Sequence, residues 1–327
     1  MKFQCYALCL LWLLVYPPRT EAHPRQYFEF YNNFWMNLHH TLFREATVRK
    51  MPLDRQKQLG VSPVATDSLS SEEKQIWDKA VQFYTDTFAG RRLLFDEGMV
   101  HINNALSLNG DESILQPKAD LPATLVDVLR SAAPVYKKHW WPEHEKTNRE
   151  WIAAMRPKVE EMAPAVIPRL EELMQEKWPA AADRFDVTYY VFEIGGAYTT
   201  ENPGHTTLAA SRPENSGLDG LETVFHEGTH LITYHLEQAL DRECQMQKKD
   251  CRNLWHAVQF FTVGAVVKAE MAKRGSTDFT PYAYKFGLYE REPFKAFRAG
   301  IEKDWSPYMA GKVSFDGAIK NLVADVP

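Results

Sequence analysis

The stretch Val224-Phe225-His226-Glu227-Gly228-Thr229-His230-Leu231-Ile232 is the most informative segment of this chain. On an α-helix, His226 and His230 lie on one face about one turn apart, so both imidazoles can reach a single metal ion. Glu227 lies where its carboxylate can reach a metal-bound water without itself being a ligand. From Thr223 to Tyr234 the segment has no Lys, Arg or Asp and no acid besides Glu227. This suits a helix buried on several sides, where an unpartnered carboxylate is costly.

The H-E-x-x-H spacing predicts a Zn²⁺ site. Zinc lowers the pKa of a bound water to near 7, and an adjacent carboxylate can take the proton and later return it. The alternative is a solvated helix that carries two histidines and a glutamate by chance. That alternative predicts charged residues nearby, and the segment lacks them. We therefore expect His226 and His230 to bind the metal and Glu227 to act as the general base.

The same nine residues resemble the active-site helix of the zincin metallopeptidases. The resemblance implies that His226 and His230 bind zinc, that Glu227 is the general base, and that the substrate is a peptide or protein. It covers these nine residues and the layout of a strand pair before the helix. The metzincin extension is absent, because positions 233 and 236 are Thr and Leu. The N-E-x-x-S-D continuation of thermolysin-like enzymes is also absent, so the sequence indicates the clan and no narrower family.

A catalytic zinc site needs a third protein ligand and an open position. If the motif helix and a helix beginning near Asn253 form an antiparallel hairpin, the motif histidines face residues 262–266, which offer no strong ligand. If the first helix ends earlier, near Leu236, His256 comes closer and Glu270 moves away. His256 is therefore the favoured third ligand. Glu270 is the main alternative and would give the His-His-Glu set of the gluzincin branch; Glu243 and Asp241 are weaker ones.

Further candidates lie outside the motif. Charge develops on the carbonyl oxygen during hydrolysis and needs a hydrogen-bond donor. Tyr284, in the aromatic segment 281–289, is the candidate for this role, with a place in an aromatic core as the alternative. Four other histidines can line a cleft, although core or surface positions are commoner for histidine; they are His39, His40, His144 and His205.

The sequence predicts an α+β fold that is mainly α, with a zincin-like core in which a strand pair precedes the H-E-x-x-H helix. Helical patterns are expected at 27–49, 70–84, 121–140 and 142–178, the last interrupted by prolines. Strands are expected at 185–192 and 205–210, since the first is rich in β-branched and aromatic residues. The motif helix is expected to run to about Ala239. The predicted parts are a signal peptide (1–22), a helical N-terminal subdomain (23–178) and a metal-binding subdomain (179–327).

The N-terminus has the pattern of a secretory signal peptide. Lys2 precedes an eleven-residue apolar run, and Thr20-Glu21-Ala22 offers a cleavage site after Ala22. The run is too short for a transmembrane helix, which needs about 20 residues. We therefore expect a secreted or periplasmic protein without a membrane span after cleavage. Cys244 and Cys251, seven residues apart, are expected to form a disulfide in such an oxidising compartment.

The formal net charge of −5 is spread over a well-mixed sequence. Such a surface offers no field for nucleic acid or anionic membranes, so neither partner is expected. The sequence does not indicate an oligomeric state. A zincin-like protein that binds a partner without catalysis is the main alternative function, and the intact Glu227 argues against it. A copper enzyme built on an N-terminal His23 is a further alternative, but the helical pattern does not suit it.

Overall fold

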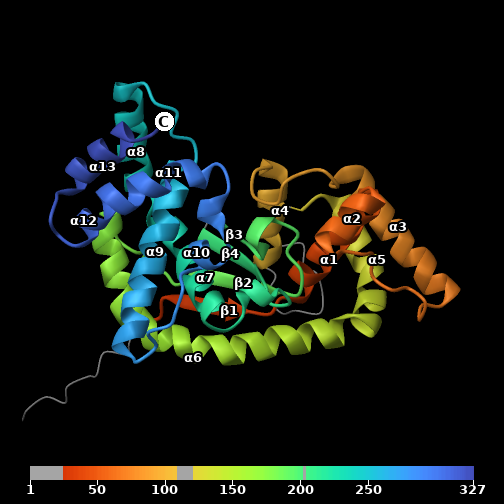
Figure 1. Cartoon of the computed structure of the whole chain (residues 1–327). Coiled ribbons are helices and arrows are strands. Elements are labelled where there is room, and N and C mark those ends of the chain that lie inside the picture. The colour runs from red at the N-terminus through yellow and green to blue at the C-terminus, as the bar shows by residue number, and fades with distance from the viewer. Residues whose placement is uncertain (1–24, 109–120, 202–203) are drawn as a thin grey trace, which may run out of the picture.

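The computed structural model describes residues 25–108, 121–201 and 204–327. Within them the chain is mainly helical around one small sheet, which confirms the predicted α+β, mainly α class (Figure 1). The strands are β1 (Phe28–Tyr31), β2 (Asp183–Thr188), β3 (Ala197–Glu201) and β4 (Gly204–Ala209). The α-helices are α1 (Phe34–Lys50), α2 (Leu53–Leu59), α3 (Ser71–Thr87), α4 (Glu97–Ser107), α5 (Ala123–His139), α6 (Trp141–Met174), α7 (Gly217–Thr229), α8 (Tyr234–Gln247), α9 (Leu254–Lys273), α10 (Tyr282–Lys285), α11 (Phe294–Gly300), α12 (Ser306–Met309) and α13 (Phe315–Ala324).

The sheet has the strand order β1-β2-β4-β3. Strands β1, β2 and β4 are parallel, and β3 is an edge strand antiparallel to β4. Thr206 of β4 pairs with Phe185 of β2 on one side and with Thr199 of β3 on the other. Because side chains alternate along a strand, these three residues point to the same face of the sheet. The predicted strands correspond to β2 and β4, and β3 was not expected.

The N-terminal segment differs from its prediction. The helical pattern expected at 27–49 begins with strand β1, and α1 starts only at Phe34. Phe28 and Phe30 are the more buried residues of the strand, so the aromatic residues follow a two-residue period before the helical one. Asn33 marks the change, because its side chain accepts hydrogen bonds from the backbone N–H groups of Trp35 and Met36.

Helix α6 runs without a break through three prolines, so the predicted interruption is wrong. Pro157, Pro164 and Pro168 are seven and four residues apart and therefore share one face of the helix, which is exposed to solvent. Water can satisfy the carbonyl groups that lose their N–H partners there. The opposite face is buried, and its packing holds the helix together.

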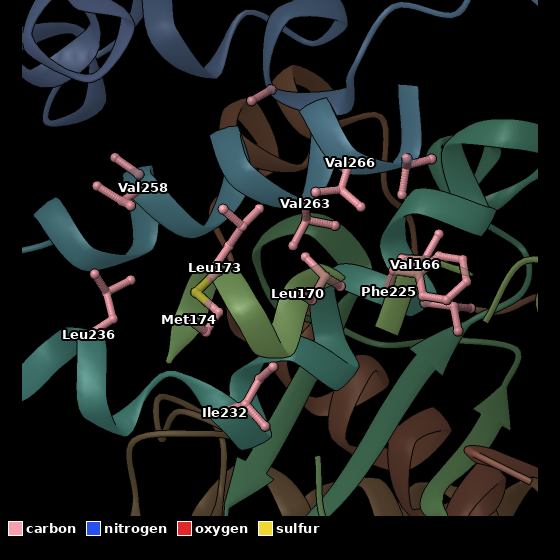
Figure 2. Packing of buried hydrophobic residues seen from close by; sticks show 14 of the residues in the cluster. Val166, Leu170, Leu173, Met174, Phe225, Ile232, Leu236, Val258, Val263 and Val266 are labelled. Carbon is pink, nitrogen blue, oxygen red and sulfur yellow. The ribbon is translucent and has the colours of Figure 1, made fainter. Parts of the chain in front are cut away.

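Two buried apolar clusters lie on the two sides of the sheet. One draws on β1, α6, α7, α8, α9 and the C-terminal helices, and Figure 2 shows part of it, with Leu170, Phe225 and Val263 from three different helices. The other draws mainly on α1, α3, α4 and α5. The predicted boundary between the two subdomains lies after residue 178. The first cluster contains residues of β1 and α6, which precede this boundary, and residues of α7, α8 and α9, which follow it.

Cys244 and Cys251 form the predicted disulfide, which joins the end of α8 to the turn before α9. Asn253 precedes α9 as expected, but its backbone is left-handed and its side chain does not cap the helix. No helix among the described residues is both long and apolar enough to cross a membrane. The predicted signal peptide, residues 1–22, lies outside the described residues.

Candidate metal centre

Three histidines from two regions of the chain converge on one point. His226 lies in α7, His230 directly follows that helix, and His256 lies in the first turn of α9. One nitrogen from each ring can be chosen so that all three lie within 4.8 Å of one another. Nε2 of His226 lies 3.2 Å from Nε2 of His256. Together the rings form a donor set that can hold a metal ion, as the sequence predicts for His226 and His230 and favours for His256.

The chemistry of this cluster fits zinc. Burial lowers the pKa of all three imidazoles, and the neighbouring rings lower those of His226 and His230 further. The rings are therefore neutral at pH 7, the form in which imidazole binds zinc. Two nitrogens bound to a tetrahedral zinc at about 2.0–2.1 Å lie roughly 3.3 Å apart. The 3.2 Å between the Nε2 atoms of His226 and His256 is close to that value.

Helix α7 ends at Thr229, so the prediction that it continues to about Ala239 is wrong. A 3₁₀ turn, η3 (His230–Ile232), follows it, and α8 begins at Tyr234. The chain is therefore not one straight helix after the second histidine, and α9 returns to pack against α7. This arrangement brings the first turn of α9, with His256, to the motif histidines.

The alternative third ligand, Glu270, does not join the cluster. It lies fourteen residues after His256 on the same helix, which corresponds to about 21 Å along the axis. Its carboxylate forms ion pairs with Lys273 and Arg274, and the Arg274 guanidinium holds the pKa of Glu270 below its usual value. The weaker candidate Glu243 accepts a hydrogen bond from Gln247.

Gly228, the first variable residue of the motif, is required by packing. A Cβ atom there would lie 2.7 Å from a ring atom of Phe28 and 2.8 Å from two ring atoms of Trp178. Real Cβ atoms essentially never come this close to another heavy atom, and both aromatic rings are buried and cannot move aside easily. The glycine therefore lets α7 lie close to β1 and the end of α6.

Residues of α9 support the histidine rings. Phe260 stacks on His226 with ring centroids 3.8 Å apart, and Trp255 stacks on His256 at 4.9 Å. Gln259, one turn after His256, is fully buried and donates from Nε2 to the backbone carbonyl of His226 at 2.8 Å. Gln259 was not among the predicted site residues; in the sequence, only its spacing of three residues from His256 points to it.

Glu227 directly follows His226 in α7 and lies in an almost closed environment, with 7% of its surface exposed. Its Oε2 atom accepts a hydrogen bond from Oγ1 of Thr199 on β3 at 2.8 Å. Burial raises the pKa of Glu227 to about 7, and the Thr199 hydrogen bond partly opposes this shift. A carboxyl group with a pKa near neutrality is suited to take and return a proton.

Comparisons with protein-family profiles, curated proteins and solved structures find no match to this chain. The interpretation of the site therefore rests on its own residues and their geometry.

The structure distinguishes two tyrosines near the site. The predicted oxyanion donor, Tyr284, donates its hydroxyl to Glu302 at 2.8 Å. Tyr282, two residues earlier, lies parallel to Phe260 with ring centroids 6.2 Å apart, and Phe260 is the ring that stacks on the first motif histidine. Burial raises the pKa of Tyr282 to about 12, and the negative charges of Glu214 and, to a smaller extent, Glu227 add to the shift.

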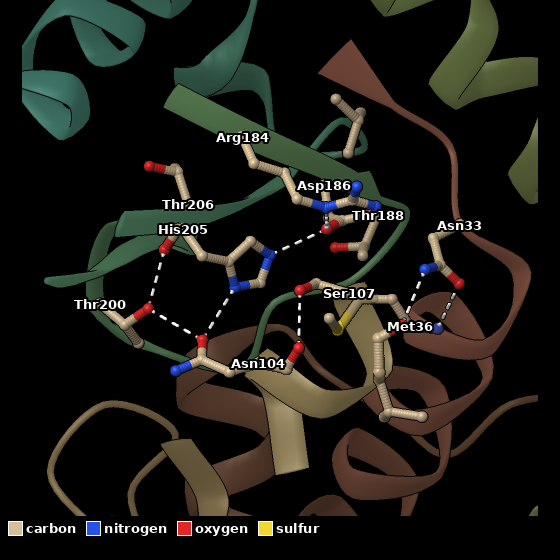
Figure 3. A network of polar contacts seen from close by, with 12 residues as sticks. Asn33, Met36, Asn104, Ser107, Arg184, Asp186, Thr188, Thr200, His205 and Thr206 are labelled. Carbon is tan, nitrogen blue, oxygen red and sulfur yellow. Dashed lines mark hydrogen bonds and ion pairs between the residues drawn. The ribbon is translucent and has the colours of Figure 1, made fainter. Parts of the chain in front are cut away.

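The other candidate histidines lie away from the cluster. His205 is buried on the opposite face of the sheet from Thr206, where it bonds Asp186 at 2.8 Å and Asn104 at 3.3 Å (Figure 3). The remaining three are buried and each contacts a tyrosine hydroxyl: His39 with Tyr84, His40 with Tyr198 and His144 with Tyr136. These four side chains are parts of the core.

Proposed function

We propose that this chain is a zinc-dependent peptidase that hydrolyses peptide bonds with Glu227 as its general base. The observation that supports this most strongly is the convergence of three neutral imidazoles beside a buried carboxyl group of near-neutral pKa. A binding or structural role for the metal gives no reason to keep a buried acid beside the histidines, because such an acid is costly.

The residues have separate roles in this proposal. His226, His230 and His256 would hold the zinc ion, which supplies a Lewis acid that makes water nucleophilic near neutral pH. Glu227 takes the proton of the attacking water on its carboxylate and passes it to the leaving amine. Thr199 holds Oε2 of Glu227 by a hydrogen bond, so the carboxylate is oriented before the substrate arrives.

Strand β3 is the natural place for a peptide substrate. It lies at the edge of the sheet, and its residue Thr199 contacts Glu227. An extended peptide that pairs with an edge strand gains main-chain hydrogen bonds without dependence on its side chains. A peptide on β3 would lie beside the general base. The disulfide supports the further proposal that the protein works in an oxidising compartment, either secreted or periplasmic.

The first experiment measures zinc content and peptide hydrolysis in four proteins: wild type, Glu227→Gln, His256→Ala and Glu270→Ala. We expect about one zinc per chain in wild type, Glu227→Gln and Glu270→Ala, and a large loss of zinc in His256→Ala. Hydrolysis should fall by at least about a hundredfold in Glu227→Gln, because the base is gone. Glu270→Ala is the matched control and should keep both zinc and activity.

Two outcomes would contradict the proposal. A Glu227→Gln protein as active as wild type would exclude Glu227 as the base. Zinc bound by the wild type without hydrolysis of any peptide in a broad library would favour the alternative of a zincin-like protein that only binds a partner.

A further inference from the structure

A row of hydroxyl groups connects Glu227 to a second buried carboxyl group, Asp183. The Thr199 hydroxyl that bonds Oε2 of Glu227 at 2.8 Å lies 2.9 Å from the hydroxyl of Thr206. The Thr206 hydroxyl in turn lies 3.4 Å from Oδ2 of Asp183. These side chains come from β2, β4, β3 and α7, so the row crosses the sheet and ends at the proposed base.

The row is sealed from solvent. Asp183 is 2% exposed, Thr206 is fully buried and Thr199 is 5% exposed. The strand register places the two threonines opposite each other on the face that carries α7. Oδ1 of Asp183 has no hydrogen-bond partner among the residues that the structure describes. An ionised carboxylate in that position would be a buried charge with no cationic side chain bonded to it among the described residues, which is costly.

The number of protons in the row shows which groups donate. The row has three oxygen–oxygen links, and the two threonine hydroxyls supply only two protons. The Thr199 hydroxyl lies 2.8 Å from Oε2 and 3.1 Å from the backbone carbonyl of Glu227, so it donates to Glu227 and accepts from Thr206. When Thr206 donates to Thr199, it has no proton left for Oδ2 of Asp183 at 3.4 Å, and a protonated Asp183 fills that link. Each hydroxyl then donates in the direction of Glu227.

We propose that Asp183 is a positioning residue, a neutral carboxylic acid that orients the Glu227 carboxylate through Thr206 and Thr199. This inference rests on the proposed role of Glu227 as base. Burial raises the pKa of Asp183 well above its usual value, and the charge of Glu227 adds to this shift, whereas the Thr206 hydrogen bond and a backbone hydrogen bond from Arg184 oppose it. The neutral acid is thus the form that the site favours. The sequence gives no sign of the row, because its members are distant in the chain.

Thr206→Val tests the row by removing its central hydroxyl with little change of shape. Thr207→Val is the matched control, because Thr207 is the next residue of β4, is fully buried and points to the opposite face of the sheet, away from the row. We expect kcat to fall about tenfold in Thr206→Val, with unchanged KM and zinc content, and to stay within about twofold of wild type in Thr207→Val. Equal kcat values in the two variants would overturn the proposal.

Substitutions at Asp183 test the neutral donor itself. Asp183→Asn keeps a donor of the same shape and should retain kcat within about threefold, whereas Asp183→Leu should lose about tenfold or more. An asparagine variant that folds and is as impaired as a folded leucine variant would contradict the neutral state. If Asp183→Leu does not fold, the Thr206 and Thr207 pair still decides the role of the row.

Infrared spectroscopy separates this inference from the proposed function. The spectrum of wild type minus that of Asp183→Asn at pH 7 should contain the C=O stretching band of a protonated carboxyl group. Bands of a carboxylate in its place would overturn the inference, whatever the enzyme assay shows. If the wild type hydrolyses nothing, the proposed function fails, and the infrared result still decides whether Asp183 carries the proton.

Discussion

Two tyrosines two residues apart have different surroundings, and the difference predicts which one assists hydrolysis. The hydroxyl of Tyr284 is engaged by Glu302, whereas Tyr282 lies over the aromatic ring that stacks on His226. We expect Tyr282→Phe to lower kcat by about a hundredfold, the usual effect of removing one donor to a developing oxyanion. Tyr284→Phe should stay near wild type. Steady-state kinetics with one peptide substrate checks both variants.

The reverse order of the two variants would restore the original assignment of Tyr284. If both variants match the wild type, neither tyrosine is the donor and another group of the site takes this role. Because each change removes a single oxygen atom, a similar melting temperature in the two proteins would exclude a difference in folding as the cause.

The sequence predicts the residues whose geometry is local and misses those whose geometry is tertiary. His226, Glu227 and His230 lie within about one turn of a helix, so their spacing alone fixes their relation. His256 could be favoured over Glu270 but not established, because its position depends on where α7 ends. Asp183 depends on the pairing of strands distant in sequence, and no local pattern marks such a residue.

The disulfide joins the end of α8 to the turn before α9, and we expect its removal to lower the stability of the protein. Cys251 is five residues before His256, and Cys244 lies in the last turn of α8. We expect the double variant Cys244→Ala/Cys251→Ala to lose about 2 kcal/mol of unfolding free energy, the size expected for a loop this short. Zinc affinity should fall as well, because the first turn of α9 is held less firmly. Urea unfolding and zinc titration measure the two effects.

Wild-type protein treated with a reducing agent should match the double variant in both measurements, since it keeps the cysteines and loses only the bond. A double variant with unchanged unfolding free energy would show that packing alone holds the two helices. Unchanged zinc affinity despite lower stability would show that α9 is held at the site by its contacts with α7.

The elements that the sequence predicted wrongly share a physical cause. Pro157, Pro164 and Pro168 lower the local helix propensity of α6, but packing of the buried face of the helix outweighs this cost. The local sequence predicts that α7 continues to about Ala239. The chain instead turns at η3, and Ile232 is buried in the core. The sequence predicts a helix from residue 27, but residues Phe28–Tyr31 form strand β1 because they pair with β2, more than 150 residues later. In each case tertiary contacts decide the structure.

The molecule has apolar clusters on both sides of one sheet, and the candidate site uses the sheet from one side only. Helix α6 runs from α5 past the sheet to α9, so it contacts elements on both sides of the sheet (Figure 1). The cluster of α1, α3, α4 and α5 supports the opposite face, on which His205 and Asp186 lie. Thr199 and Thr206 face α7, the helix that carries His226 and Glu227. The helical N-terminal part thus holds the strands that position the proposed base, although none of the three metal-site histidines comes from it.

The same helical part predicts how the whole molecule responds to acid. Burial lowers the pKa of His39 to about 3, and a hydrogen bond with Asn103 offsets only part of this shift. His40 and His144 are shifted in the same direction by burial. In the unfolded chain a histidine has a pKa of about 6.5. Below that pH the unfolded state binds protons that the folded state refuses, so the unfolding free energy falls as the pH falls.

His39→Gln tests this linkage, because glutamine does not titrate and can still bond the Tyr84 hydroxyl that His39 contacts. One such histidine changes the unfolding free energy by up to about 1.4 kcal/mol per pH unit between about pH 6.5 and pH 3. We expect urea unfolding of the wild type to show a steeper loss of stability between pH 7 and about pH 4.5 than the variant. The difference in unfolding free energy, wild type minus variant, should therefore fall as the pH falls, whatever its value at pH 7. Parallel curves would mean that His39 accepts a proton in the folded state, and the acid sensitivity would then have to come from other groups.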